Sequence, residues 1–281
     1  MKNTILFLIF SLLQFTNQSK AQNIRFIYNY KSIQDTLHKD EVSNEIMILE
    51  IEQKSGNSIF SALKKIESDS IMTTNSRKGF NVFPDNRIKT KYIIQKKDKK
   101  VYLYTTNHSM NPVEKVEDDR NFKWNLKNEK KEILSYSVQK ATTNFAGRFW
   151  TAWFAKSLPF SDGPYKFNGL PGLILKISDE DGSHSFELIG IEKMGPNTYN
   201  LIDDDHSYFS YRTARPITNE KYKIEYLKYR NDPMSEIRQK VIAGDILFNN
   251  VNEKNDYLRQ NEINFKNEIN RDNNNIEKDL L

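Results

Sequence analysis

Four histidines and one acidic run carry the chemistry for metal binding or proton transfer. The histidines are scattered, and none belongs to an H-x-x-x-H or H-E-x-x-H pattern: His38, His108, His184 and His206. The run Asp203-Asp204-Asp205-His206 offers ligands for a divalent cation, but consecutive residues rarely converge on one ion and calcium loops space their oxygens more widely. We interpret it as a polar turn between Leu201 and Tyr208, and we predict no metal site.

The usual patterns of nucleophilic catalysis are also missing from the sequence. The 281 residues contain no cysteine, so the chain has no thiol nucleophile, thiolate metal site or disulfide. It has no G-x-S-x-G element and no glycine-rich phosphate loop. We therefore predict no catalytic residue and no cofactor. A hydrolase whose site is assembled from distant segments is the third alternative for function.

The most aromatic stretch is the better candidate for a binding site. In Arg148–Phe154, which we call the aromatic ribbon, alternation along a strand places Trp150 and Phe154 on one face and Trp153 on the other. The second face is covered either by the following loop, Leu158–Phe167, or by an apolar ligand. The candidate ligand-binding residues are Arg148, Trp150, Trp153, Phe154, Phe160 and Tyr165.

Arg148 has two possible partners. Its planar guanidinium could stack on a neighbouring ring or hold a carboxylate or phosphate of a ligand. It could equally pair with Asp162 inside the protein. We favour the internal pair, because an arginine among bulky aromatic residues needs a partner when it is buried.

A turn and a strand follow the ribbon. Pro171 fixes φ for the second position of a β-turn and Gly172 accepts positive φ at the third, so Leu170–Leu173 is typical of a type II turn. The apolar residues after it predict a strand that is covered on both faces at its start. We assign the motif a structural role: Gly169, Leu170, Pro171, Gly172, Leu173 and Ile174.

These residues resemble a known family. The stretch Gly169–Ile174 is the motif that names the GLPGLI proteins, and Arg148–Phe154, Pro159, Gly163-Pro164-Tyr165 and Lys140-Ala141 resemble its flanks. The resemblance is specific from Tyr136 to Glu192, and Asn274-Asn275-Ile276-Glu277 is similar to a family element in which proline more often stands at the position of Asn275. It implies export to a Gram-negative envelope and a mainly β fold, with no established activity. It also implies an accessory role beside outer-membrane transporters and peptidases.

The elements that must position these residues are mostly strands. Period-two patterns and turn signals predict a mainly β fold, a curved antiparallel sheet or partial barrel with meander topology. The hairpin of Tyr92–Ile94 with Val101–Tyr104 turns at a lysine-rich tip, and the Asp-Gly turn at Asp181-Gly182 joins two further strands as an antiparallel pair. The predicted strands are Ile24–Tyr30, Ile46–Glu52, Tyr92–Ile94, Val101–Tyr104, Ile133–Val138, Leu173–Ile177 and Phe186–Ile191.

Helical signals concentrate near the end of the chain. Asp232 as N-cap, Pro233 in the first turn and apolar residues at helical spacing predict a helix that ends at Gly244. Phe60–Ile66 fits a short helix or a strand equally well. Residues 249–281 are rich in asparagine and charge, so we expect a loosely docked helix or a disordered tail.

The N-terminal segment has the pattern of a secretory signal. Lys2, an apolar run over Ile5–Leu13 and the small-residue pattern Ser19-Lys20-Ala21 predict cleavage after Ala21, and the run is too short for a membrane span. The expected organisation is a signal peptide at 1–21, a β-rich GLPGLI-type domain at 22–248 and the tail at 249–281. We expect a periplasmic or secreted protein without an integral membrane span.

The charge of the chain does not favour a nucleic-acid-binding protein. The net charge of +5 falls to +3 after loss of Lys2 and Lys20, and the remaining charges are spread along the chain. The leading hypothesis is a non-catalytic envelope accessory or carrier protein that binds an apolar ligand or a protein partner. The alternative is a docking partner of an outer-membrane transporter or a peptidase.

Overall fold

The computed structural model describes residues 23–80, 83, 85, 87–105, 113–195 and 214–280. The signal segment, His108 and the run Asp203–His206 lie outside the described residues. Within the described ranges, twelve strands form one sheet in the order β12-β6-β5-β4-β3-β2-β1-β11-β10-β9-β8-β7. The strands are β1 (Ile24–Ile33), β2 (Val42–Ile51), β3 (Ser58–Ala62), β4 (Ile93–Lys97), β5 (Lys100–Thr105), β6 (Glu114–Asp118), β7 (Asn125–Ile133), β8 (Tyr136–Phe145), β9 (Arg148–Ala155), β10 (Leu173–Asp179), β11 (His184–Lys193) and β12 (Arg215–Thr218).

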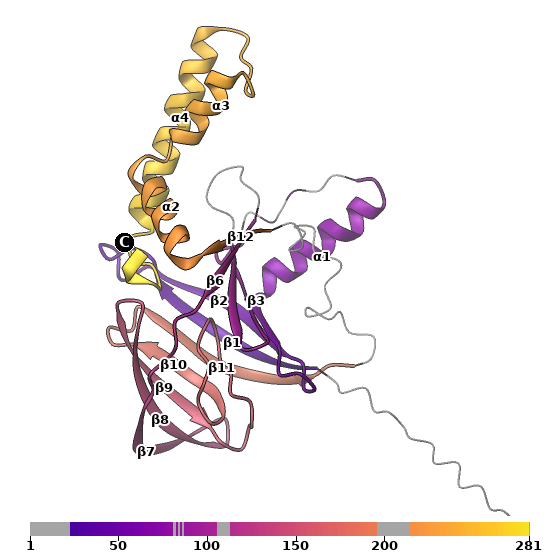
Figure 1. Ribbon diagram of the computed structural model, residues 1–281, viewed down its shortest axis with the longest axis vertical. Coiled ribbons are helices and arrows are strands. Elements are labelled where there is room, and N and C mark those ends of the chain that lie inside the picture. Colours follow the sequence, from indigo (N-terminus) through magenta and orange to yellow (C-terminus); the bar gives the residue numbers. More distant parts are fainter. Residues whose placement is uncertain are drawn as a thin grey trace, which may run out of the picture.

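The sheet consists of two meanders joined side by side. Strands β1–β6 form one meander and β7–β11 the other, and they meet where β1 pairs with β11. Every pair is antiparallel except β12 with β6, so the sheet is mixed, and it does not close into a barrel. It bends so that β7–β10 turn away from β2–β6 (Figure 1). The predicted mainly β fold with a curved sheet and a C-terminal helix is confirmed.

The backbone conformation of the turns shows which of the predicted hairpins and strands are correct. The lysine-rich tip is a two-residue turn in which Asp98 and Lys99 both adopt positive φ, and it joins β4 to β5 as expected. Antiparallel pairing of Ile177 with Phe186 is also confirmed. The strand predicted over Ile133–Val138 is wrong, because Leu134 and Ser135 adopt positive φ there and form the turn between β7 and β8.

Both faces of the sheet carry apolar residues. Phe26, Tyr28 and Tyr30 alternate along β1 into the main core, which also contains Trp150 and Phe154 of β9. On the opposite face, helix α1 (Leu63–Arg77) lies against β2 and β3 over a smaller cluster. The stretch 60–66 is thus the end of β3 followed by the start of α1.

In the described residues, three α-helices and the short 3-10 helix η2 (Lys278–Leu280) follow β12. The α-helices come first. They are α2 (Asn219–Asn231), α3 (Ser235–Ala243) and α4 (Val251–Arg271). The helix predicted before Gly244 is confirmed as α3, and Gly244 ends it in the left-handed conformation. Its predicted start is wrong: Met234 is the N-cap, whereas Asp232 ends α2 and forms an ion pair with Arg238.

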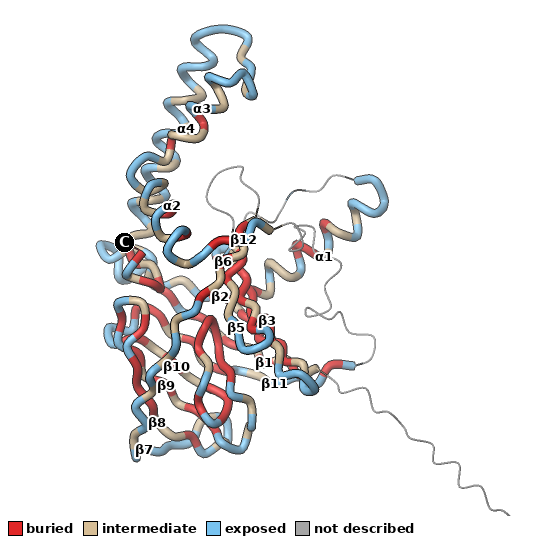
Figure 2. Tube along the Cα trace, viewed as in Figure 1, coloured by how far each residue is buried: buried red, intermediate tan, exposed pale blue. Residues whose placement is uncertain are grey.

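Helices α3 and α4 with their connection, residues 235–271, form what we call the helical arm. The arm projects from the sheet (Figure 1), and its surface is mostly exposed (Figure 2). No residue of α4 is buried. The chain then returns to the sheet, where Ile276 and Leu280 belong to the main core. In the described part of the chain, no helix is both long and apolar enough to cross a membrane.

Candidate functional site

The aromatic ribbon is strand β9, and its first face is filled by the protein itself. Trp150 and Phe154 are fully buried. The Trp150 ring lies 4.7 Å from that of Phe167, which belongs to residues 158–172, here called the central loop. The loop also reaches the other meander, where Lys96 of β4 forms an ion pair with Asp162 and donates to the Phe167 carbonyl at 3.0 Å. The bent sheet therefore wraps around the central loop.

The loop covers the opposite face from the one predicted. Phe160 is partly buried and packs edge-on against Phe26 of the main core at 5.4 Å, rather than over Trp153. Trp153 is partly buried on the second face, where the Lys131 ammonium lies 4.0 Å from its ring centroid. Phe149 on the same face is 40% exposed. An apolar ligand groove along this ribbon stays a prediction.

The glycine-proline turn has a different geometry from the predicted type II turn. The Gly172 amide donates to the Leu170 carbonyl at 2.8 Å, and the Leu173 amide donates to Leu158 at 2.9 Å instead of closing the turn. Gly172 has φ of 150°, and a Cβ at this position would lie 2.7 Å from the carbonyl carbon of Ala155. Only glycine fits where the chain enters β10 against the end of β9.

Arg148 makes an internal pair, as favoured, but not with Asp162. Its Nη1 donates to Asp179 Oδ2 at 2.7 Å, and its Nη2 donates to Asn274 Oδ1 at 2.6 Å. It also donates to the carbonyls of Asn275 and Ile276. A guanidinium suits this role because its several planar donors can hold a carboxylate and backbone oxygens together.

A second buried cation holds the same part of the chain. Lys166 Nζ donates to Asp118 Oδ2 at 2.7 Å and to Glu277 Oε1 at 2.6 Å, and Arg120 reaches Glu277 at 2.7 Å. Tyr165 Oη donates to the same Glu277 oxygen at 2.7 Å. Burial alone would raise the pKa of Glu277, but Lys166 and Arg120 hold this pKa below its ordinary value. The carboxylate therefore stays charged inside the core.

Arg148 and Lys166 together anchor residues 273–280, which we call the C-terminal segment. Asn274, Ile276 and Glu277 are buried, so the end of the chain is built into the core although α4 before it is exposed. Sequence reasoning missed this anchor. Its one local signal was the Asn274–Glu277 match to the family element, because the contacts join residues more than 100 positions apart.

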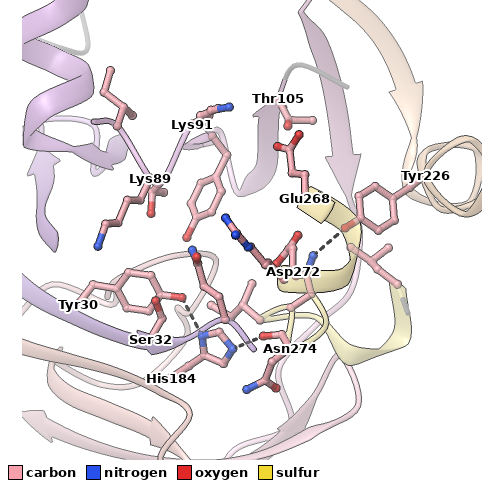
Figure 3. A pocket seen from close by; sticks show the side chains of 18 of the residues that line it. Tyr30, Ser32, Lys89, Lys91, Thr105, His184, Tyr226, Glu268, Asp272 and Asn274 are labelled. Atoms are coloured by element: carbon pink, nitrogen blue, oxygen red, sulfur yellow. Dashed lines mark hydrogen bonds between the residues drawn. The ribbon is translucent and has the colours of Figure 1, made fainter. Parts of the chain in front are cut away.

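A cleft of about 590 Å³ lies beside this anchor, and we call it the tyrosine cleft. Its walls come from the end of β1, the segment before β4, the end of β5, helix α2, the last turns of α4 and the C-terminal segment (Figure 3). Among the six predicted ligand-binding residues, Tyr165 alone lines it. Its aromatic lining residues are Tyr30, Tyr92, Tyr165, Tyr222 and Tyr226.

The floor of the cleft is a fixed hydrogen-bonded chain. His184 Nε2 lies 2.8 Å from the Asn274 carbonyl, which can only accept, so Nε2 carries the proton and Nδ1 accepts from Tyr30 Oη at 2.7 Å (Figure 3). Burial, with Arg148 nearby, lowers the pKa of His184 to about 4. The imidazole is therefore neutral at pH 7 and both nitrogens are engaged.

Tyr92 is the unsatisfied group of the cleft. Its ring packs edge-on against Tyr165 at 5.4 Å, and its hydroxyl is buried without a hydrogen-bond partner among the described residues. Burial raises the pKa of Tyr92 well above its ordinary value, so the hydroxyl keeps its proton. A buried hydroxyl without a partner costs about 1–3 kcal/mol.

The groups in this cleft are suited to hydrogen bonding. Its tyrosines with raised pKa values and its neutral histidine act as donors and acceptors. Over the ranges that the structure describes, no group of three or more histidines and carboxylates could hold a metal ion.

Comparison with known proteins adds a family match and a fold. Residues 145–176, which include the ribbon and the glycine-proline motif, match the model of a family described as "Protein of unknown function (Porph_ging)". No curated protein matches the chain.

Two solved structures are similar to this chain. "Structure of PNGF-II in C2 space group" has a TM-score of 0.50 at 19% identity and aligns over 75% of this chain and 34% of that one. "Structure of PNGF-II in P21 space group" has a TM-score of 0.48 at 18% identity, with the same two coverages. The aligned part is about a third of those chains, and at this identity the likeness shows the fold alone.

Proposed function

We propose that the chain is an exported, non-catalytic accessory protein of the cell envelope, of the GLPGLI type, that binds a small polar ligand in the tyrosine cleft. The leader pattern at 1–21 supports export, and the Porph_ging match supports the family because it contains the motif Gly169–Ile174. The observation that carries the proposal is a cleft of about 590 Å³ whose buried Tyr92 hydroxyl has no partner among the described residues.

The cleft fits a ligand better than the aromatic ribbon does. The first face of the ribbon is already packed against the central loop, with Trp150 and Phe154 fully buried. The cleft, in contrast, has a volume within the range of about 300–1,000 Å³ that is usual for small-molecule sites. Its hydroxyl, amide and charged groups favour a polar ligand over the apolar one expected from the ribbon.

The state of the histidine supports binding rather than catalysis. A general base needs a free nitrogen and a pKa near the working pH. Both nitrogens of His184 are hydrogen-bonded, and its pKa of about 4 keeps it neutral. The tyrosine hydroxyls around it are protonated at pH 7, so the cleft offers fixed donors and acceptors.

Native mass spectrometry of protein recovered gently from its producing cells tests this function. The wild type is expected to carry a small adduct. Asn267→Trp places a large ring in the cleft from an exposed position of α4 and should abolish the adduct. Asn270→Trp, three residues along the same helix and outside the cleft lining, is the matched control and should retain it. An adduct that all three proteins carry equally would contradict the proposal.

The helical arm favours a second candidate function, docking to a protein partner. Three apolar residues near the connection of α3 and α4 are exposed, namely Ile242 at 86%, Leu247 at 85% and Val251 at 70%. Exposed apolar residues gathered on a projecting element are typical of interaction surfaces. The partner proposed here is an outer-membrane transporter or a peptidase of the envelope.

Pull-down from envelope extracts tests the docking function. Replacing Ile242, Leu247 and Val251 together by serine should abolish capture of the transporter or peptidase without lowering the melting temperature. Ile224→Ser is the control, since Ile224 is exposed on α2, outside the arm. Undiminished capture by the triple variant would show that the arm does not bind this partner.

A further inference from the structure

The tyrosine cleft carries charges of opposite sign on opposite sides. Lys89 and Lys91 come from the segment that leads into β4, and Glu268 and Asp272 come from the end of α4 and the residue after it. Figure 3 shows the two lysines on one side and the two carboxylates on the other. A ligand in this cleft therefore meets a positive wall and a negative wall.

The positive wall has hydrogen-bond donors that are not used within the described part of the protein. Lys91 is exposed and makes no ion pair with the residues described. Lys89 donates to Ser43 Oγ at 2.9 Å, which uses one of its three ammonium protons. The neighbouring Tyr92 hydroxyl is a further donor, and it is buried without a partner in the described ranges. Two ammonium groups and a phenol on one side suit a carboxylate.

The negative wall is one face of a helix end. Asn264, Asn267, Glu268 and Arg271 recur at helical spacing along the last turns of α4, and Asp272 is its C-cap. The C-terminal end of a helix attracts positive charge, and the two carboxylates add to that effect. The positive charge of Arg271 offsets part of this negative charge. The wall as a whole favours an ammonium group, while the two asparagine amides can pair with peptide groups.

We propose that the tyrosine cleft binds a dipolar ligand, a short peptide with free ends, whose carboxylate lies toward Lys89 and Lys91 and whose ammonium lies toward Glu268 and Asp272. The inference rests on the proposed function and assigns a ligand class to the same site. A cleft of about 590 Å³ is larger than one amino acid fills, and its tyrosine rings supply apolar area between the charged walls.

Calorimetric titration with one tripeptide in four forms tests the assignment. Trialanine is used free, N-acetylated, C-amidated and with both ends capped, and free alanine is the length control. Each cap removes one charged contact, so each should weaken binding about tenfold, and the doubly capped form should bind weakest. Equal binding of all four forms, or no binding of free trialanine, would overturn the inference. Tighter binding of alanine than of trialanine would overturn the peptide assignment.

Variants then locate each end of the peptide. Lys91→Ala leaves Lys89 in place, so it should reduce the difference in affinity between free and C-amidated trialanine but keep the full penalty for acetylation. Glu268→Gln should do the reverse. Lys97→Ala, in β4 and exposed outside the cleft, is the control and should keep both penalties. Retention of both penalties in Lys91→Ala and Glu268→Gln would place the peptide elsewhere.

Failure of this inference is separable from failure of the proposed function. If free trialanine does not bind while wild type carries an adduct that Asn267→Trp loses, the cleft binds a ligand of another class. If neither the adduct nor peptide binding is found, both the inference and the proposed function are wrong.

Discussion

At the residue scale, two buried positions join β9 to its neighbours. Gly172 lies where the chain enters β10, and a Cβ there would collide with the backbone carbonyl of Ala155 at the end of β9. Arg148 of β9 donates to Asp179 of β10 and to Asn274 of the C-terminal segment. Each position therefore tolerates little change.

Gly172→Ala should be severely destabilising, because the added methyl group collides with backbone that cannot move away. We expect a loss of about 3 kcal/mol or more in the free energy of unfolding, measured by urea denaturation. Gly56→Ala is the matched control: its φ of 75° is also positive, but a Cβ there would meet nothing within 4 Å. It should cost about 1 kcal/mol. Equal losses in the two variants would show that the close approach to Ala155 is unimportant.

His184 should make stability depend on pH. Its folded pKa of about 4 lies below the ordinary 6.5, so the unfolded chain binds more protons between these values and stability is lost as pH falls from 6.5 to 4. When His184 is protonated in both the folded and the unfolded protein, below pH 4, the total loss in the free energy of unfolding is up to about 3 kcal/mol. In His184→Gln this loss is absent, so the melting temperature of wild type should fall further than that of the variant over this range. Asp179, whose pKa burial raises to about 6, is present in both proteins.

Parallel pH profiles of wild type and His184→Gln would show that the histidine is not buried in its neutral form.

At the scale of elements, turn residues and periodicity predict the hairpins with clear signals. The lysine-rich tip between β4 and β5 and the Asp-Gly turn before β11 both carry such signals. The β7–β8 turn is formed by Leu134 and Ser135, which rarely adopt positive φ, so the sequence does not predict this turn. Helix α2 was missed because its buried side is only Tyr222 and Tyr226 in a run of polar residues. The C-terminal segment was missed because its partners are ion pairs with distant residues.

Removing one ion-pair partner of the C-terminal segment should destabilise the protein. Glu277→Ala leaves Lys166 buried with Asp118 as its remaining carboxylate partner among the described residues, and a cost of about 3–5 kcal/mol follows from breaking a buried pair. Glu262→Ala removes the exposed pair with Lys266 and is the control, which should unfold at nearly the same denaturant concentration as wild type. Chemical denaturation measures both. A cost below about 1 kcal/mol for Glu277→Ala would show that the segment is only loosely docked.

At the scale of the whole molecule, the fold class was predictable and the candidate site was not. Short strands with turn signals are sufficient for a mainly β curved sheet. The sequence also predicted that the loop after the ribbon covers it, but the loop covers the face with Trp150 instead of the face with Trp153. The tyrosine cleft is assembled from β1, the segment before β4, α4 and the C-terminal segment, which meet only after the two meanders join and the arm returns to the sheet. Apart from Tyr165 and the family element at Asn274–Glu277, no local pattern marked its residues as a binding site.

The most direct test of ligand binding in the tyrosine cleft is the electron density there in crystals grown from protein as recovered from its producing cells. We predict density for a small molecule that contacts Tyr92 Oη and lies between Lys91 and Glu268. A cleft that holds only water, with an ordered molecule along Trp153 on the ribbon instead, would contradict the account.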